Sequence, residues 1–297
     1  MTLSDARLST SAGMPWQRSL IPDSMERQML SDRAQLNAGM TDLRLSDGEV
    51  LRCFQAGQGE AILFVPVISE VNFVYAPQIA QFSAKFRTIA YDPSVRRTRR
   101  FSIRDRAEQT IYVLDALGIQ AAHLVAWSDV GAAAYDLARR WPDRCRSLVL
   151  FCLPDRYALP PMLKLLCYLL KHLPIENLTP DFFVRYVLSC YLRGPRIPHR
   201  LISSYARRIP RLTALYKYSI LPNLYQHVPV ADEVIAPAAV ITGEFDALAS
   251  AMQARRMAAL LPNARPSIVI ERGEHLLPFT QPNEVNQIME SFYRTIE

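Results

Sequence analysis

One stretch of the chain, residues 122–141, sets narrow limits on how the whole can fold. A continuous apolar run ends at Trp127, a single Ser128 follows, and a run of small residues with helical periodicity begins at Val130. This order predicts a buried strand, a sharp turn and a helix. A serine at such a turn is exposed at the end of the sheet, where a substrate can reach it. Fold and function therefore both depend on what surrounds Ser128.

Apolar strands and amphipathic helices alternate along much of the chain. A turn at Ser46–Gly48 separates two segments of alternating polarity, which predicts a hairpin. Beyond it we predict strands at 61–65, 86–92, 122–127, 146–152, 239–246 and 267–270, and helices at 74–85, 103–117, 130–141, 250–261 and 283–295. Continuous apolar strands are typical of a sheet covered on both faces. The pattern predicts an α/β fold with a mostly parallel, doubly wound sheet.

Two segments fall outside this alternation. Residues 1–38 are polar and are predicted to form an N-terminal extension, in which 25–36 could be a short helix. Residues 154–233 contain only helical patterns, punctuated by prolines, and lie between two predicted parallel strands. We predict that this block is a helical lid inserted into a core made of 39–153 and 234–297.

The composition indicates the compartment and the classes of ligand. The chain has 297 residues, half of them hydrophobic, and a formal net charge of +6, which is only mildly basic. Its five cysteines contain no Cys-x-x-Cys pair, as expected of small core residues in a reducing compartment. No apolar run is long enough for a signal peptide or a membrane span. We expect a cytoplasmic protein that needs no cofactor or metal and binds no nucleic acid, because the motifs for those ligands are missing.

Basic residues gather at two places in the sequence. Six arginines lie between Arg96 and Arg106, and a second group lies between Arg193 and Arg211. We predict that the Arg96–Arg106 segment binds a carboxylate, a phosphopantetheine phosphate or an acidic carrier protein, so that the substrate is a small molecule or a carrier-bound acyl group. A solvated basic surface is the alternative.

Three polar residues follow three of the predicted strands. They are Ser128, Asp246 and His275, in that chain order. A serine hydroxyl is a poor nucleophile at neutral pH, and it needs an imidazole to accept its proton and a carboxylate to orient that imidazole. Parallel strands bring their carboxyl ends to one edge of the sheet, so the three residues are predicted to form a catalytic triad. Glu244 is a rival for the acid, and the position of Asp246 in its turn favours Asp246.

The segments around these residues resemble the α/β-hydrolase superfamily. The matching segments are its nucleophile elbow, acid turn and histidine loop, at Ala126–Gly131, Gly243–Asp246 and Gly273–Phe279. The resemblance covers residues 40–297 and implies an α/β-hydrolase sheet with a helical lid, of the esterase or thioesterase branch. Aligning the turn that closes the elbow helix makes Ser128 the nucleophile rather than Asp129.

The resemblance also assigns roles to neighbouring residues. It implies that the backbone N–H groups of Ile68 and Asp129 form the oxyanion hole. It further implies that Trp127, Val67 and Leu276 contact the substrate. The Asp129 side chain has three interpretations: it recognises a cationic group of the substrate, relays a proton, or caps the following helix.

Two positions depart from the family pattern. Val130 stands where the family usually carries glycine, and its β-branched side chain should crowd the elbow. Pro66-Val67 stands where the family usually carries His-Gly, directly before the predicted oxyanion donor. The sequence therefore resembles the fold more closely than it resembles a standard esterase.

These features support three functions in descending order. The first is serine-dependent hydrolysis of an ester or thioester of an apolar acyl, polyketide or aromatic substrate. The second keeps the fold but uses the Ser128–His275 pair for proton transfer in a lyase, cyclase or decarboxylase, which the departures at Val67 and Val130 favour. The third is a binding protein on a degenerate hydrolase fold, against which the presence of all three triad residues argues.

Overall fold

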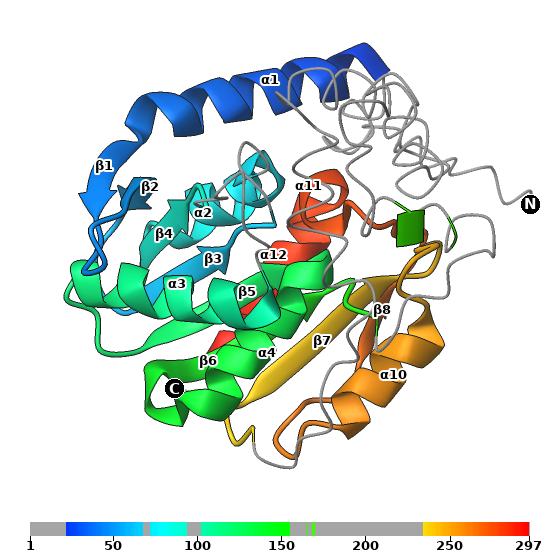
Figure 1. Cartoon of the computed structure of the whole chain (residues 1–297). Helices are drawn as coiled ribbons and strands as arrows, with labels where there is room; N and C mark the ends of the chain where they lie inside the picture. The colour runs from blue at the N-terminus through cyan, green and yellow to red at the C-terminus, as the bar shows by residue number, and fades with distance from the viewer. Residues whose placement is uncertain are drawn as a thin grey trace, which may run out of the picture.

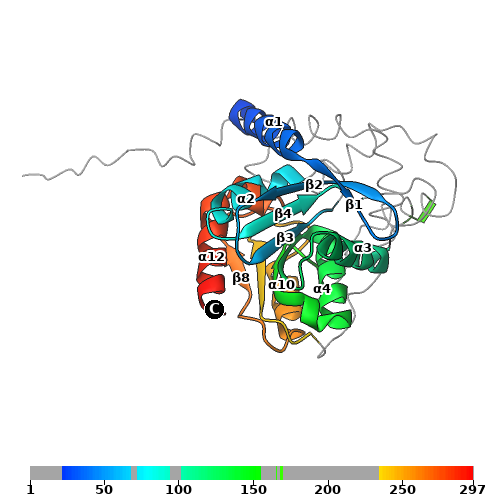
Figure 2. The same ribbon diagram turned by 90° about the vertical axis from the view of Figure 1, so that its left-hand side faces the viewer.

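The computed structural model describes residues 22–67, 72–93, 102–154 and 234–296, together with 165, 168 and 169. These residues form one eight-stranded sheet with helices on both faces (Figures 1 and 2). The predicted α/β fold is confirmed. Most of the predicted lid, and residues 1–21 of the predicted extension, lie outside the described residues.

The sheet is mostly parallel, as predicted. Its strand order is β1-β2-β4-β3-β5-β6-β7-β8. The strands are β1 Thr41–Arg44, β2 Val50–Ala56, β3 Ala61–Val65, β4 Arg87–Tyr91, β5 Ala122–Trp127, β6 Cys145–Phe151, β7 Ala238–Gly243 and β8 Ile268–Ile270. The hairpin β1–β2 and the pair β2–β4 are antiparallel, and all other neighbours are parallel. Every residue of β3, β5 and β7 is buried, which is why these strands read as continuous apolar runs.

Helices cover the two faces of this sheet. They are η2 Asn72–Tyr75, α2 Ala76–Phe82, α3 Ile103–Ala116, η3 Ser128–Val130, α4 Gly131–Arg140, η4 Pro142–Arg144, α10 Ala251–Ala259, α11 Leu277–Thr280 and α12 Pro282–Arg294. Figure 2 shows α3 and α4 on one side of the sheet and α2 and α12 on the other. The helices predicted outside residues 154–233 are present, although the segment 74–85 begins as a 3-10 turn, and α11 was not predicted because its four residues are too short for a period.

An additional helix, α1 (Pro22–Gly39), precedes the hairpin and lies over η2 and β2 (Figure 1). Met25, Met29 and Leu36 are its buried residues and join the main core. The short helix predicted at 25–36 is therefore present and longer than predicted. Because it buries apolar side chains, this part of the predicted extension packs as a layer on the core.

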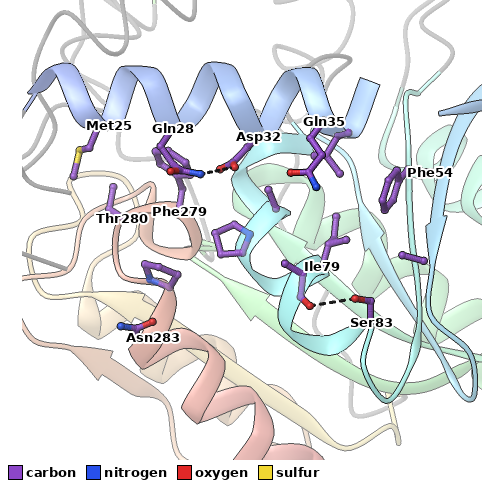
Figure 3. Close-up of a pocket in the computed structure, with 16 residues that line it drawn as sticks. Met25, Gln28, Asp32, Gln35, Phe54, Ile79, Ser83, Phe279, Thr280 and Asn283 are labelled. Atoms are coloured by element: carbon purple, nitrogen blue, oxygen red, sulfur yellow. Dashed lines mark hydrogen bonds between the residues drawn. The ribbon is translucent and has the colours of Figure 1, made fainter. Parts of the chain in front are cut away.

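A pocket of about 670 Å³ lies between α1, α2 and the turn from α11 to α12 (Figure 3). Helix α1 forms one wall of this pocket. On that wall the side-chain amide of Gln28 donates a hydrogen bond to the carboxylate of Asp32, at 2.7 Å. None of the three predicted triad residues lines it.

In the described part of the chain, no helix combines the length and the apolar character that crossing a bilayer requires.

Candidate active site

Ser128 lies at the turn between β5 and η3. Its backbone has a φ of 62°, in the left-handed region that non-glycine residues rarely occupy. Holding a side chain there costs on the order of 1–3 kcal/mol, and such strain is concentrated at functional sites. The turn follows the fully buried β5 and leaves Ser128 with 9% of its surface exposed. The predicted strand, turn and helix are present.

Gly131, the residue after Val130, packs closely against a neighbouring side chain. A Cβ atom at Gly131 would lie 2.8 Å from the Leu153 side chain. Val130 is fully buried with a helical φ of −71°. Val130 therefore lies buried in the core, directly before a glycine that packs against Leu153.

Asp246 and His275 follow β7 and β8 on loops whose backbones touch. A Cβ atom on Gly243 would lie 2.2 Å from the carbonyl carbon of Gly273, so neither loop could carry a larger residue at this contact without moving. Asp246 Oδ1 also accepts hydrogen bonds from the backbone N–H groups of Leu248 and Ala249, at 2.8 and 2.9 Å. The carboxylate is thus fixed before any partner is considered.

The structure brings the three predicted triad side chains into one hydrogen-bonded chain. His275 Nε2 lies 2.9 Å from Ser128 Oγ, and His275 Nδ1 lies 2.9 and 3.0 Å from the two carboxylate oxygens of Asp246. The rival acid, Glu244, instead accepts the backbone N–H of Arg272 on the exposed side of its loop. The residue beside the imidazole is therefore Asp246.

The charge of Asp246 is set by two opposing effects. Burial by itself would raise the pKa of this carboxyl group, but the adjacent His275 and the hydrogen bonds that the carboxylate accepts lower the pKa below its ordinary value of 3.8. Asp246 is consequently ionised at neutral pH. An ionised carboxylate accepts a hydrogen bond from Nδ1–H and so keeps the ring proton on Nδ1. Nε2 is then unprotonated and can accept the serine proton.

A second serine–histidine–carboxylate chain shows that proximity is not sufficient for reactivity. Ser147 Oγ lies 2.8 Å from His123 Nδ1, and His123 Nε2 lies 3.3 Å from Glu60. Ser147, however, lies near the start of β6, away from the carboxyl ends of the parallel strands, and is 0% exposed. Ser128 differs because the left-handed turn presents its hydroxyl at the carboxyl edge of the sheet.

Two further aromatic residues hold the site together. The indole N–H of Trp127 donates to the backbone carbonyl of His275 at 2.5 Å, so the strand end and the histidine loop are linked directly. Tyr75 accepts a hydrogen bond from the backbone N–H of Trp127 and donates to the carbonyl of Val65. Tyr75 was not predicted, since nothing in the sequence relates η2 to the ends of β3 and β5.

The residues predicted to form the oxyanion hole are only partly described. Ile68 lies outside the described residues, whereas Asp129 is in η3 directly after Ser128. Neither η3 nor α4 has a side-chain cap, so the helix-cap interpretation of Asp129 is wrong. Its carboxylate is 4% exposed and forms an ion pair with Arg106 at 3.7 Å.

The arginines of the predicted basic segment, Arg96–Arg106, do not share one environment. Arg96, Arg97, Arg99 and Arg100 lie outside the described residues. Arg104 lies on the surface of α3 and pairs with Glu108, whereas Arg106 is 2% exposed inside the fold. Arg106 is therefore no part of a basic surface, because its position in α3 turns it toward the core.

The residues predicted to contact substrate lie near the same edge of the sheet. Val67 follows β3 and Leu276 follows His275, and both are nearly buried, as is Trp127.

Among the described residues one cluster has metal-ligand spacing, formed by Cys152, Asp246 and His275 with atoms within 4.8 Å of one another. In that cluster the acid and the imidazole are already hydrogen-bonded to each other, and burial raises the pKa of the Cys152 thiol well above its ordinary value, which disfavours the thiolate that a metal would need.

Known proteins share this architecture across almost the whole chain. An esterase from Thermogutta terrifontis superposes with a TM-score of 0.70 at 19% identity, covering 86% of this chain and 98% of the esterase. The carboxylesterase CesB of Bacillus subtilis gives a TM-score of 0.69 at 19% identity, covering 91% and 98%. The meta-cleavage product hydrolase CumD of Pseudomonas fluorescens gives 0.68 at 18% identity, covering 88% and 100%.

Sequence comparison points in the same direction. A RutD protein of Pseudomonas savastanoi pv. phaseolicola, whose name gives carbamate hydrolysis as a proposed activity, is 25% identical over 61% of this chain and 71% of its own length. No protein-family model matches the chain. The sheet order, the helices and these likenesses show that the chain has the α/β-hydrolase fold.

Proposed function

We propose that the protein is a serine hydrolase of an ester or thioester whose acyl group is apolar, polyketide or aromatic. The observation that carries the proposal is the hydrogen-bonded chain from Ser128 through His275 to Asp246, with the serine on a left-handed turn. The relatives carry the names of an esterase, a carbamate hydrolase and a meta-cleavage product hydrolase. Attack of a nucleophile on a carbonyl group is the chemistry that such a site supports best.

In the first half of the proposed reaction, Ser128 Oγ attacks the carbonyl carbon while its proton passes to His275 Nε2. The tetrahedral oxyanion accepts hydrogen bonds from the N–H groups of Asp129 and Ile68. The intermediate collapses to an acyl-enzyme, and His275 gives the proton to the departing alcohol or thiol. Asp246 remains ionised throughout and stabilises the imidazolium.

In the second half, a water molecule gives a proton to His275 Nε2 and attacks the acyl carbon. Collapse of the second tetrahedral intermediate returns the proton to Ser128 Oγ and releases the carboxylic acid. Val67 and Leu276 come from the strand and loop ends beside the triad, and their apolar side chains would favour an apolar acyl group.

Covalent labelling tests the nucleophile directly. A fluorophosphonate probe should add one adduct to the purified protein, seen by intact mass, and the adduct should be absent from Ser128→Ala. Ser147→Ala is the matched control, because it removes the serine of the other serine–histidine pair, and it should label as the parent protein does. Equal labelling of Ser128→Ala would refute the proposal.

The proton-transfer alternative rests on Pro66-Val67, which replaces the His-Gly of the family pattern. A lyase, cyclase or decarboxylase would use Ser128 and His275 without forming an acyl-enzyme. Turnover of p-nitrophenyl butyrate and of a butyryl thioester, each abolished in Ser128→Ala, would favour hydrolysis. A protein that labels with the probe but releases neither nitrophenol nor thiol would favour the alternative.

A further inference from the structure

Helix α1 carries a stripe of polar residues on the face that borders the pocket of about 670 Å³. Gln28, Asp32 and Gln35 follow one another at spacings of four and three residues, so they share one side of the helix. Figure 3 shows this side facing α2. Met25 and Leu36 line the same pocket and are buried. A helix that only covered a core would carry apolar residues along this whole face.

The other walls of the pocket are mainly apolar. Phe54 of β2, Ile79 of α2 and Phe279 of α11 line them (Figure 3). The end of α1 can lie against Phe54 because Gly39 has no side chain, and a Cβ atom there would lie 2.6 Å from the Phe54 ring. Pockets that bind small organic molecules have volumes of roughly 300–1,000 Å³ and combine apolar walls with a few polar groups. The pocket beside α1 has this size and this composition.

The single charge that borders the pocket is negative. Of the sixteen described residues that line it, Asp32 alone has an ionisable side chain, although the whole chain carries a net charge of +6. Partial burial raises the pKa of this carboxyl group above its ordinary value of 3.8. Among the described residues Asp32 accepts one hydrogen bond, from the neutral amide of Gln28, and forms no ion pair. The loss of water around the carboxylate is therefore compensated only in part.

Further hydrogen-bond acceptors lie in the same pocket. Because the amide N–H of Gln28 donates to Asp32 Oδ1, the amide oxygen of Gln28 and Oδ2 of Asp32 remain as acceptors. The hydroxyl groups of Ser83 and Thr280 each donate a proton to a backbone carbonyl, at 3.1 and 3.3 Å. Their oxygens can then accept a hydrogen bond from a ligand. A positively charged ligand with several N–H donors complements these groups.

We infer that the pocket between α1, α2 and the turn from α11 to α12 binds a small organic cation, in which an ammonium group is joined to an apolar body. The ammonium group takes Asp32 as its counter-ion, and the apolar body packs against Phe54, Ile79 and Phe279. Hydrogen bonds to an ionised carboxylate are roughly twice as strong as those between neutral groups, so the charge selects this ligand among apolar molecules. No triad residue lines the pocket, and the inference does not depend on the proposed function.

Three ligands with one apolar body separate the role of the charge from that of the apolar walls. They are 4-phenylbutylamine, 4-phenylbutan-1-ol and 4-phenylbutyrate, which are positive, neutral and negative at pH 7.5. In isothermal titration calorimetry the full-length protein should bind one equivalent of the amine, at least tenfold more tightly than the alcohol. Tenfold corresponds to about 1.4 kcal/mol. The butyrate should bind more weakly than the alcohol, because Asp32 repels it.

Substitution of the carboxylate tests its role as the counter-ion. Asp32→Asn keeps the shape of the side chain and an oxygen for Gln28, so it should weaken the amine at least tenfold and the alcohol less than threefold. Glu26→Gln is the matched control, because Glu26 is an acid of the same helix that does not line the pocket, and it should bind all three ligands as the parent protein does. Ser128→Ala should also match the parent protein, which would place the amine outside the proposed active site.

Filling the pocket tests its location without a change of charge. Ala80 is an exposed residue of α2 that lines the pocket, so the ring in Ala80→Phe should occupy part of it and weaken the amine and the alcohol alike, at least tenfold. Ala84→Phe is the matched control, since Ala84 is exposed in the turn after α2 and does not line the pocket. This pair decides the question if Asp32→Asn fails to fold.

Several outcomes would overturn the inference. One is a parent protein that binds no amine at millimolar concentration, or that binds the amine and the alcohol equally. Another is a folded Asp32→Asn that loses less than tenfold in affinity for the amine. Unchanged affinity in Ala80→Phe, or loss of the amine in Ser128→Ala, would show that the amine binds elsewhere. Failure of the proposed hydrolase function would leave all of these binding results unchanged.

Discussion

Replacing Asp246 by asparagine should nearly abolish turnover, and the reason is visible in the hydrogen bonds of the acid turn. Oδ1 accepts the backbone N–H groups of Leu248 and Ala249 at 2.8 and 2.9 Å, and an amide nitrogen cannot take its place there. In Asp246→Asn the amide oxygen must therefore stay at that position. The amide nitrogen then occupies the position of Oδ2, which lies 2.9 Å from His275 Nδ1.

This forced orientation reverses the tautomer of the imidazole. The amide N–H at the Oδ2 position is directed at Nδ1 and opposes an Nδ1–H, although the amide oxygen at Oδ1 also lies 3.0 Å from Nδ1, so the favoured tautomer carries the ring proton on Nε2, which lies 2.9 Å from Ser128 Oγ. An Nε2–H cannot accept the serine proton. The expected loss in kcat is about 10⁴-fold, equivalent to about 5.5 kcal/mol of transition-state stabilisation. The fold should survive, because both backbone hydrogen bonds to the side chain are kept.

Steady-state hydrolysis of p-nitrophenyl butyrate and the rate of fluorophosphonate labelling measure this loss independently. Glu244→Gln is the control, since Glu244 is an acid of the same turn that binds the backbone of Arg272 on the exposed side. It should change kcat less than threefold. A folded Asp246→Asn with kcat within tenfold of the parent protein would refute the assigned role of Asp246.

Two further predictions concern the indole of Trp127 at the site and the buried thiol of Cys145 at the start of β6. Trp127→Phe removes the indole N–H that donates a hydrogen bond to the backbone carbonyl of His275. The loss of one hydrogen bond should lower both kcat/KM and the labelling rate about fivefold. Unchanged rates would contradict the inference that this hydrogen bond holds the histidine loop in place. Burial raises the pKa of the Cys145 thiol from 9.0 to about 12, so the unfolded chain ionises first and stability is lost as pH rises above 9. The loss from this thiol is up to about 1.4 kcal/mol per pH unit, and urea titrations at pH 8 and 10.5 should show a smaller decline for Cys145→Ala. An equal decline in both proteins would show that this thiol does not contribute.

The architecture was predictable because its signals are local. Continuous apolar strands that alternate with amphipathic helices indicate a parallel sheet covered by helices on both faces. The strand at 122–127 was predicted with its observed bounds. The elbow was predictable because a single serine separates an apolar run from a run of small residues. A contact with a neighbour distant in sequence could not be predicted in this way, as the packing of Leu153 against Gly131 shows.

The candidate site shows the same division between local and distant information. Order along the chain selected Ser128, Asp246 and His275, but only their coordinates show that Asp246 rather than Glu244 reaches the imidazole. Sequence reasoning placed Arg106 in a surface cluster, although the capping box of Ser102 and Asp105 and the inward stripe of α3 could have shown that it faces the core.

The sequence by itself determined that this chain forms a mostly parallel, doubly wound α/β sheet and which residues stand at the ends of its strands, since both follow from periodicity and order. Only the tertiary structure decided which of those residues meet. The register between β3 and β5 brings the carbonyl of Val67 and the carboxylate of Asp129 to the guanidinium of Arg106. The left-handed turn separates Ser128 from the equally well-paired Ser147. Contacts of this kind depend on strand register and backbone conformation, which residue spacing does not encode.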